Sequence, residues 1–437
     1  MKAQLLTVAS AWGSRVVSAA AQLIAVRYAM EKLGQDGFGA FALLGALLPW
    51  AMLFEFGIGY GLQNYISESR ANGRAYRYLI THTTAAILSI SFVLSVLAVF
   101  ASPKIAEIYL KSVVVLNAED KETATVLALV IFLWTTASGV YYKILFAEHK
   151  GWIANIIPAI GAIVGLVLLK LVRIDGHGNV LTAVIASYYL PNAILGILVA
   201  FFVLRVHRKA KPSMLVENSL DQRVKAIDFV RRAASFWGFA VCAALVLQVD
   251  YWVISQKLTA EDVVTYTIVF KIFSLALFVY TAVLQAMWPV FSENMASKNW
   301  HLVNQLIFKN ISAGTALAIT FCLTFLLFKE DILDFMKTTH EIANSTIILF
   351  SVYLLVRVWS DTFATVLQSA NIMRPFFFLV PTQATLGLIT QWILTDSYGI
   401  NGVVIGLIAA FSFTVVPGLW FIYRNFVRAG CVKSGNA

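Results

Sequence analysis

Six ionisable side chains lie well inside the long apolar stretches of this sequence, while Arg27 lies nearer an edge. The six are Arg15, Glu55, Asp250, Lys271, Arg357 and Asp361. A charge inside a hydrocarbon core costs about 2.5 to 3.5 kcal/mol on insertion scales, so each is a candidate for function if these stretches cross a membrane. The basic members suit an anionic ligand, and arginine is the better suited to several phosphate oxygens. The acidic members suit proton uptake or cation binding. These six residues form the candidate site.

Spacing along two predicted hairpins places four of these charges at matching depths. The first hairpin turns near Gly34, and Arg15 lies 19 residues before this turn while Glu55 lies 21 residues after it. Antiparallel helices would bring both side chains to nearly one level. In the first hairpin of the second half, the same arithmetic places Asp250 and Lys271 within about 3 Å in depth at 1.5 Å per residue. We therefore expect two ion pairs across hairpins.

The remaining two charges belong to one predicted helix. Arg357 and Asp361 are four residues apart, which places both on the same face near the middle of the span. Two interpretations of the three pairs stay open at this stage. They are structural bridges in which each charge neutralises the other, or some of them line a wet cavity and act on a ligand.

The composition excludes a soluble globular chain. Of the 437 residues, 59% are hydrophobic and 13% are charged, whereas charged residues are about a quarter of a typical soluble domain. The net charge of +10 does not indicate nucleic-acid binding, because the basic residues are scattered over short loops and form no dense patch. The three cysteines are far apart, so we expect no disulfide framework, no metal site and no cofactor.

Apolar windows long enough to cross a hydrocarbon core of about 30 Å recur along the whole chain. The predicted spans are 6–30, 38–60, 79–101, 123–145, 152–172, 180–204, 234–256, 263–288, 305–328, 342–368, 376–395 and 402–423. With both termini in the cytoplasm, roughly 20 Lys and Arg residues lie on the inner side and about 9 on the outer side, as the positive-inside rule requires. The predicted fold is an all-α polytopic membrane protein with about twelve transmembrane helices.

The longest break between spans, 205–233, is strongly basic and divides the chain into six spans on each side. It predicts three parts: an N-terminal six-helix bundle at 1–204, a cytoplasmic linker at 205–233 and a C-terminal six-helix bundle at 234–437. The second part of the linker either forms an amphipathic helix on the inner leaflet or serves only to set topology.

A shift of about 225 positions aligns the two halves, as expected for a duplicated transporter fold. The sequence ASAWG at 9–13 falls on ASFWG at 234–238, and Ser67-Glu68 falls on Ser292-Glu293. Each half has an even number of spans, so the duplication is parallel and its axis runs along the membrane normal. We expect two pseudo-symmetric bundles around a central cavity.

Several motifs resemble the opening hairpins of polysaccharide and O-antigen flippases. These flippases form the polysaccharide transporter branch of the multidrug/oligosaccharidyl-lipid/polysaccharide exporter superfamily. The motifs of the first half are GQDGFGAFAL at 34–43, FEFGIG at 54–59 and SES at 67–69; those of the second half begin with DYWVIS at 250–255. Span count, six-plus-six division and the basic linker extend the resemblance over nearly the whole chain. Glu55 stands where aspartate is commoner in the family.

The resemblance implies a flippase that moves undecaprenyl-diphosphate-linked oligosaccharide repeat units across the bacterial inner membrane. The implied mechanism is alternating access of two bundles, coupled to an ion. Arg15, Lys271 and Arg357 would then bind the diphosphate. Glu55, Asp250 and Asp361 would couple ions or pair structurally. The implied partners are membrane lipids and the polysaccharide polymerase and chain-length machinery.

Three other functions remain open. A cation-coupled multidrug exporter and a lipid II flippase share the superfamily architecture. A membrane enzyme of polysaccharide assembly, such as a polymerase or ligase, would keep catalytic groups in a loop on the outer face. The longest outer break, about 102–122, is too short for a convincing active site, and its charged residues are Lys104, Glu107, Lys111 and the cluster at 119–122. We therefore expect a transporter and not an enzyme.

Overall fold

The computed structural model describes residues 2–71, 76–172, 179–209, 219–338, 341–370 and 372–434. Within these ranges the regular structure is helical, which confirms the predicted all-α class. The chain forms two compact units, Met1–Ala244 and Leu245–Ala437, whose boundary lies inside a long helix. The predicted limits 1–204 and 234–437 for the bundles stay a prediction. Residues 210–218 of the predicted linker lie outside the described ranges, and its last part, from Ser219, is helical and continuous with the following span.

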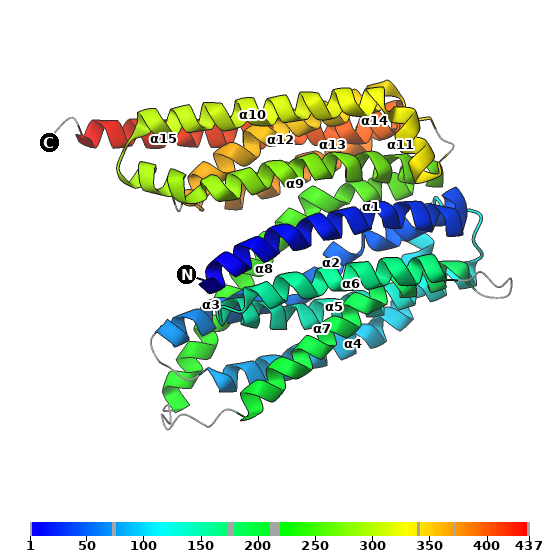
Figure 1. Cartoon of the computed structure of the whole chain (residues 1–437), viewed down its shortest axis with the longest axis horizontal. Helices are drawn as coiled ribbons and strands as arrows, with labels where there is room; N and C mark the ends of the chain where they lie inside the picture. Colours follow the sequence, from blue (N-terminus) through cyan, green and yellow to red (C-terminus); the bar gives the residue numbers. More distant parts are fainter. Residues whose placement is uncertain are drawn as a thin grey trace. The chain divides into compact units, whose positions relative to one another are not determined.

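The first unit begins with α1 (Lys2–Gly45), which contains a sharp break at Gly34. Gly34 has φ 68° and ψ −174°, a conformation that glycine adopts without the steric cost of a Cβ. The chain then returns through α2 (Leu48–Met52), the short 3₁₀ helix η1 (Leu53–Glu55) and α3 (Ile58–Ala71). Figure 1 shows α1 and the α2–α3 segment running in opposite directions. The hairpin predicted to turn near Gly34 is present.

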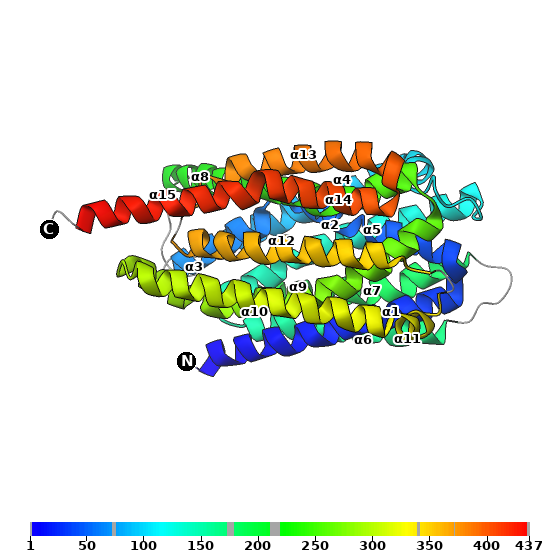
Figure 2. The same cartoon turned by 90° about the horizontal axis from the view of Figure 1, so that it is seen from above.

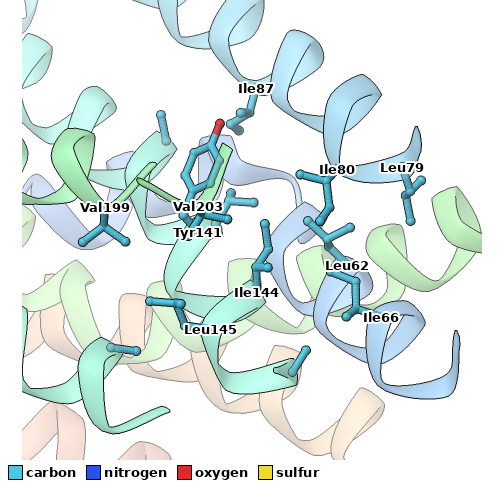
Figure 3. Close-up of a cluster of buried hydrophobic side chains, with 14 residues drawn as sticks. Leu62, Ile66, Leu79, Ile80, Ile87, Tyr141, Ile144, Leu145, Val199 and Val203 are labelled. Atoms are coloured by element: carbon cyan, nitrogen blue, oxygen red, sulfur yellow. The ribbon is translucent and has the colours of Figure 1, made fainter. Parts of the chain in front are cut away.

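Four long helices complete the first unit: α4 (Arg77–Tyr109), α5 (Ala118–Ala147), α6 (Gly151–Leu171) and α7 (Val180–Lys209). The N-terminus of α5 is capped by the side chain of Asn117, which accepts a hydrogen bond of 2.7 Å from the backbone N–H of Asp120. α5 packs against α3, α4 and α7 and is the central helix of this unit. Figure 3 shows the apolar cluster that joins them, in which Tyr141 and Ile144 of α5 meet Ile80 of α4 and Val203 of α7.

The helix that joins the units is α8 (Ser219–Lys257). The second unit continues with α9 (Ala260–Ala296), α10 (Trp300–Leu327), the short α11 (Lys329–Met336), α12 (Asn344–Ser369), α13 (Phe376–Tyr398), α14 (Ile400–Ala410), the π-helical turn η2 (Phe411–Val415) and α15 (Val416–Ser434). A capping box between Thr259 and Asp262 fixes the start of α9. α9, α10 and α12 pack on one another, and α10 and α12 run side by side in Figure 2.

Eleven helical stretches among the described residues are long and apolar enough to cross a membrane. The first, Ser10–Glu55, has 46 residues, about 69 Å at 1.5 Å per residue, which is more than twice the thickness of a hydrocarbon core. It therefore contains two spans separated at Gly34, and all twelve predicted spans fall on helices. Apolar side chains on these helices face outward, and Phe100 of α4 is 78% exposed. Lipid explains this surface, because it solvates apolar side chains.

Helix boundaries follow the predicted duplication. The break at Gly34 and the N-cap Thr259 are 225 positions apart, as are the first residues of α6, Gly151, and of α13, Phe376. Packing repeats as well, since α5 contacts α3, α4 and α7 in the first unit as α12 contacts α9, α10 and α14 in the second. The structure thus supports two related six-helix units. The central cavity between them stays a prediction.

Candidate functional site

Arg357 and Asp361 form the predicted pair on α12. Nη2 of Arg357 lies 3.0 Å from Oδ2 of Asp361, and Nε donates to both carboxylate oxygens at 3.3 Å. The remaining Nη1 donates to the hydroxyl of Tyr353 at 3.1 Å. Only 17% of the Arg357 side chain and 21% of the Asp361 side chain are exposed. Two charges are therefore held inside a membrane span in neutralised form.

Aromatic rings surround this guanidinium. Its central carbon lies 5.9 Å from the ring centroid of Tyr353 and 5.3 Å from that of Phe411, distances that suit cation–π attraction. Phe411 begins the π-helical turn η2, which contacts α12. A π-turn adds a residue to the helix path and shifts the side chains that follow, and such turns are frequent at functional sites. The turn brings an aromatic ring of the last span to Arg357.

The predicted pair of Asp250 and Lys271 is absent. Asp250 is 2% exposed, and its carboxylate accepts a hydrogen bond from the hydroxyl of Tyr266 on α9 and one of 2.9 Å from the backbone N–H of Tyr251. The depth argument found the correct neighbouring helix, α9, but a helix presents different faces at one depth, and Tyr266 lies on the face that packs on α8. The prediction is therefore corrected from an ion pair to a carboxylate–tyrosine contact.

Lys271 lies one and a half turns further along α9 and is half-buried. Within the described part of the chain, no hydrogen bond or ion pair involves its ammonium group. A lone cation of this kind is costly at membrane depth. In the described part of the second unit, Arg357 is paired with Asp361, whereas Lys271 has no counter-ion.

The predicted pair of Arg15 and Glu55 is also wrong. Glu55 ends η1 and is 8% exposed, and its Oε1 accepts a hydrogen bond of 2.6 Å from the backbone N–H of Gly59. The nearby cation is Lys143 of α5, whose ammonium lies 3.8 Å from the ring centroid of Tyr60. Arg15 is exposed on α1. The break in the second span turns Glu55 toward α5, which a count along straight helices does not anticipate.

The chain around Glu55 is not a regular helix. Phe56 and Gly57 have φ 51° and 70°, and the backbone N–H of Phe56 bonds the carbonyl of Leu53 at 3.0 Å. That carbonyl also accepts a hydrogen bond of 2.8 Å from Nε1 of Trp237 in α8. Non-helical backbone at membrane depth is tolerated where protein buries it or where it lines a wet cavity.

A pocket of about 420 Å³ lies beside this break, entirely within the first unit. Its walls come from α1, α2, η1, α5, α6 and α7. Figure 1 shows α1, α2, α5, α6 and α7 in one group. The lining residues include Gln22, Glu55, Thr136, Tyr142, Lys143, Tyr188, Tyr189 and Asn192. We call this cavity the N-terminal pocket. Of the predicted site residues, Glu55 alone lines it.

Lys143 is a candidate that the sequence interpretation missed. It lies two residues before the end of the predicted span 123–145, so its position inside a span was visible in the sequence. The aromatic and amide residues of the pocket carried no such signal, because tyrosine and asparagine are ordinary in a span. Only the packing of α5 on α7 brings them together.

A second polar cluster lies at one end of the first unit, outside the spans. Glu148, just after α5, contacts Nε2 of His207 at 2.7 Å, Nζ of Lys150 at 3.1 Å and the hydroxyl of Tyr76 at 3.2 Å. Burial raises the pKa of Glu148, but the hydrogen bonds and charges of His207 and Lys150 outweigh it and lower the pKa from 4.5 to about 2. The carboxylate ties α4, α5 and α7 together.

Comparisons with known proteins follow the whole length of the chain. The model of the family described as "Polysaccharide biosynthesis protein" matches residues 8–295, and that of the MatE family matches residues 238–393. A Yersinia pseudotuberculosis protein named "Putative O-antigen export protein" is 37% identical over 97% of this chain and 96% of its own. A Salmonella typhi protein named "Putative O-antigen transporter" is 35% identical over 96% of both chains.

Solved transporters share the fold. An inward-facing multidrug resistance transporter of the MATE family superposes with a TM-score of 0.76 at 14% identity, covering 96% of both chains. The lipid II flippase MurJ in an inward closed conformation superposes with a TM-score of 0.72 at 13% identity, covering 96% of this chain and 87% of that one. At such identity the likeness establishes the fold and nothing further.

Proposed function

This chain belongs to the polysaccharide biosynthesis protein family, and on that premise we propose that it is a flippase for the lipid-linked repeat units of O-antigen. Its substrate is an undecaprenyl-diphosphate-linked oligosaccharide, which it moves from the cytoplasmic to the outer leaflet of the bacterial inner membrane. The observation that carries the proposal is the identity of 33% to 37% over nearly full length with three proteins named for O-antigen export or transport. The solved multidrug transporter and the solved lipid II flippase described above share only 14% and 13% identity with this chain, respectively.

The charges of the spans support a diphosphate ligand. Lys271 offers an ammonium group without a counter-ion in the described second unit, and Arg15 is exposed on α1. The guanidinium of Arg357 donates to Asp361 and Tyr353 in the structure, so a phosphate would bind it by taking the place of the carboxylate. In this proposal both termini are cytoplasmic and the two units alternate access.

Ion coupling is the second part of the proposal. Asp361 is neutralised by Arg357 in the structure. A diphosphate that takes the guanidinium would leave the carboxylate to bind a proton or a cation, and the reverse exchange would release the ligand. Asp250 and Glu55 are the other buried acids available for this role. The polymerase and chain-length machinery, which use the exported units, are the proposed partners.

The test replaces Arg15 or Arg357 by Ala in cells that make the glycan. We expect lipid-linked repeat units to accumulate on the cytoplasmic face while the variant protein stays at its normal level in the membrane. Arg374→Ala is the matched control, because Arg374 is exposed between α12 and α13. Normal surface glycan with both Arg15→Ala and Arg357→Ala would contradict the proposed role of these residues.

A further inference from the structure

We propose that the N-terminal pocket binds a neutral sugar ring of the transported glycan, separately from the diphosphate. This inference rests on the proposed flippase function and adds to it a place for the sugar. The pocket is formed by residues of the first unit alone. Its volume of about 420 Å³ lies in the lower part of the range of small-molecule sites, roughly 300 to 1,000 Å³.

The break in the second span indicates that the pocket is part of the fold's design and not a chance packing gap. A continuous helix over 38–60 would satisfy its own backbone, yet the chain breaks into α2, η1 and α3 and places Leu48, Met52 and Glu55 on the pocket wall. Broken helices at membrane depth occur where the backbone lines a binding site or a wet cavity. The broken span therefore suits a pocket that holds a polar ligand.

The walls offer the two kinds of contact that a sugar ring needs. Aromatic rings of Phe132, Tyr188 and Tyr189 meet edge to face, with centroids 4.9 Å apart in each neighbouring pair, and form a rigid apolar wall suited to the C–H face of a sugar. Gln22 and Asn192 also line the pocket, and carboxamides both donate to and accept from hydroxyl groups.

Thr136 points to the same kind of ligand. It lies on α5 in the pocket lining and is 6% exposed, and its Oγ1 is buried without a hydrogen-bond partner among the described residues. A buried hydroxyl without a partner is costly, so such groups are normally satisfied by a ligand or water. A sugar hydroxyl would satisfy it once the Thr136 side chain rotates toward the cavity, because less than 1 Å² of Oγ1 is exposed in the structure.

The charge of the pocket argues for a neutral group and against the diphosphate. Its lining contains one carboxylate, Glu55, and one ammonium group, Lys143. The two charges balance, whereas a diphosphate requires an excess of positive charge. Neutral hydroxyls can accept from Lys143 and donate to Glu55 at the same time.

Gly139 provides a way to fill the pocket without disturbing the fold. It lines the pocket on α5, and a Cβ added there meets no heavy atom within 4 Å. Leucine also favours a helix more than glycine does. Gly139→Leu should therefore leave folding intact and occupy the space of the ligand. Gly13→Leu is the matched control, because Gly13 is an exposed helical glycine of α1, outside the pocket lining, whose added Cβ also meets nothing within 4 Å.

The first experiment measures export of the lipid-linked glycan in cells. Gly139→Leu should lower surface glycan by about tenfold or more. The leucine side chain would occupy the volume that the sugar ring needs, and a pocket discriminates strongly against a ligand that no longer fits. Gly13→Leu should export like the unchanged protein. If the unchanged protein itself exports no glycan, the flippase proposal fails; if it exports and Gly139→Leu exports equally well, only the sugar pocket is refuted.

The second experiment asks which part of the substrate enters the pocket. Cys242, Cys322 and Cys431 are replaced by Ser, Gly139→Cys is added, and the rate of labelling by a small maleimide is measured on the purified protein. Lipid-linked repeat units extracted from cells that lack the flippase should slow labelling severalfold. Undecaprenyl diphosphate without sugar should not. Equal protection by both lipids, or protection by neither, would overturn the sugar assignment.

Discussion

Removal of Arg357 should destabilise the protein more than removal of Arg357 and Asp361 together. Arg357→Met leaves the carboxylate of Asp361, only 21% exposed, without its counter-charge, and leaves the hydroxyl of Tyr353 without its donor. Loss of one partner from a buried pair costs about 3 to 5 kcal/mol. Because both side chains keep some exposure, we expect about 3 kcal/mol for Arg357→Met.

The double variant Arg357→Met with Asp361→Leu replaces the pair by apolar side chains of similar size. Such replacements are often neutral, so we expect a loss of about 1 kcal/mol or less relative to the unchanged protein. The assay is reversible unfolding in mixed micelles, followed by helical circular dichroism, for the unchanged protein, both single variants and the double variant. Single effects that add within about 0.5 kcal/mol would refute the reasoning, since residues in contact are expected to couple.

The same four proteins decide between a bridge and a binding site. A double variant that regains stability but exports no glycan would support a role for these charges in transport. Export restored together with stability would show that the pair is a structural bridge. The cycle therefore separates the two interpretations that the sequence left open.

Two further predictions concern stability. Glu148→Gln should make the stability of the protein less sensitive to acid. The carboxylate stabilises the fold fully above its ordinary pKa of 4.5, and this contribution is lost as the pH falls toward the folded pKa of about 2. Between pH 5 and pH 2, the midpoint of thermal unfolding should therefore fall less in the variant than in the unchanged protein. An equal decline in both proteins would contradict this. Gly406→Val should lower the midpoint of thermal unfolding, because its Cβ would lie 2.6 Å from the backbone nitrogen of Gln391. The resulting overpacking costs about 1 to 3 kcal/mol. An unchanged midpoint would show that α13 and α14 can move apart without a loss of stability.

The twelve spans and their duplication could be predicted from the sequence because they depend on local properties. Apolar length sets where a helix can cross a bilayer, and the shift of the repeat places Gly34 and Thr259 at equivalent turns. The pair of Arg357 and Asp361 was predictable for the same reason, since both residues belong to one helix and their contact follows from its period.

The contacts between helices were decided by the tertiary structure. Depth along a hairpin is fixed by residue counts, but the rotation of each helix is not, so Asp250 meets Tyr266 instead of Lys271. The break at Phe56 and Gly57 turns Glu55 away from Arg15 toward Lys143. The sequence alone determined which charges lie inside the membrane, because that depends on local hydropathy. Only the packing of helices decided which groups they meet and where a pocket forms, because rotation, breaks and π-turns depend on every neighbour at once.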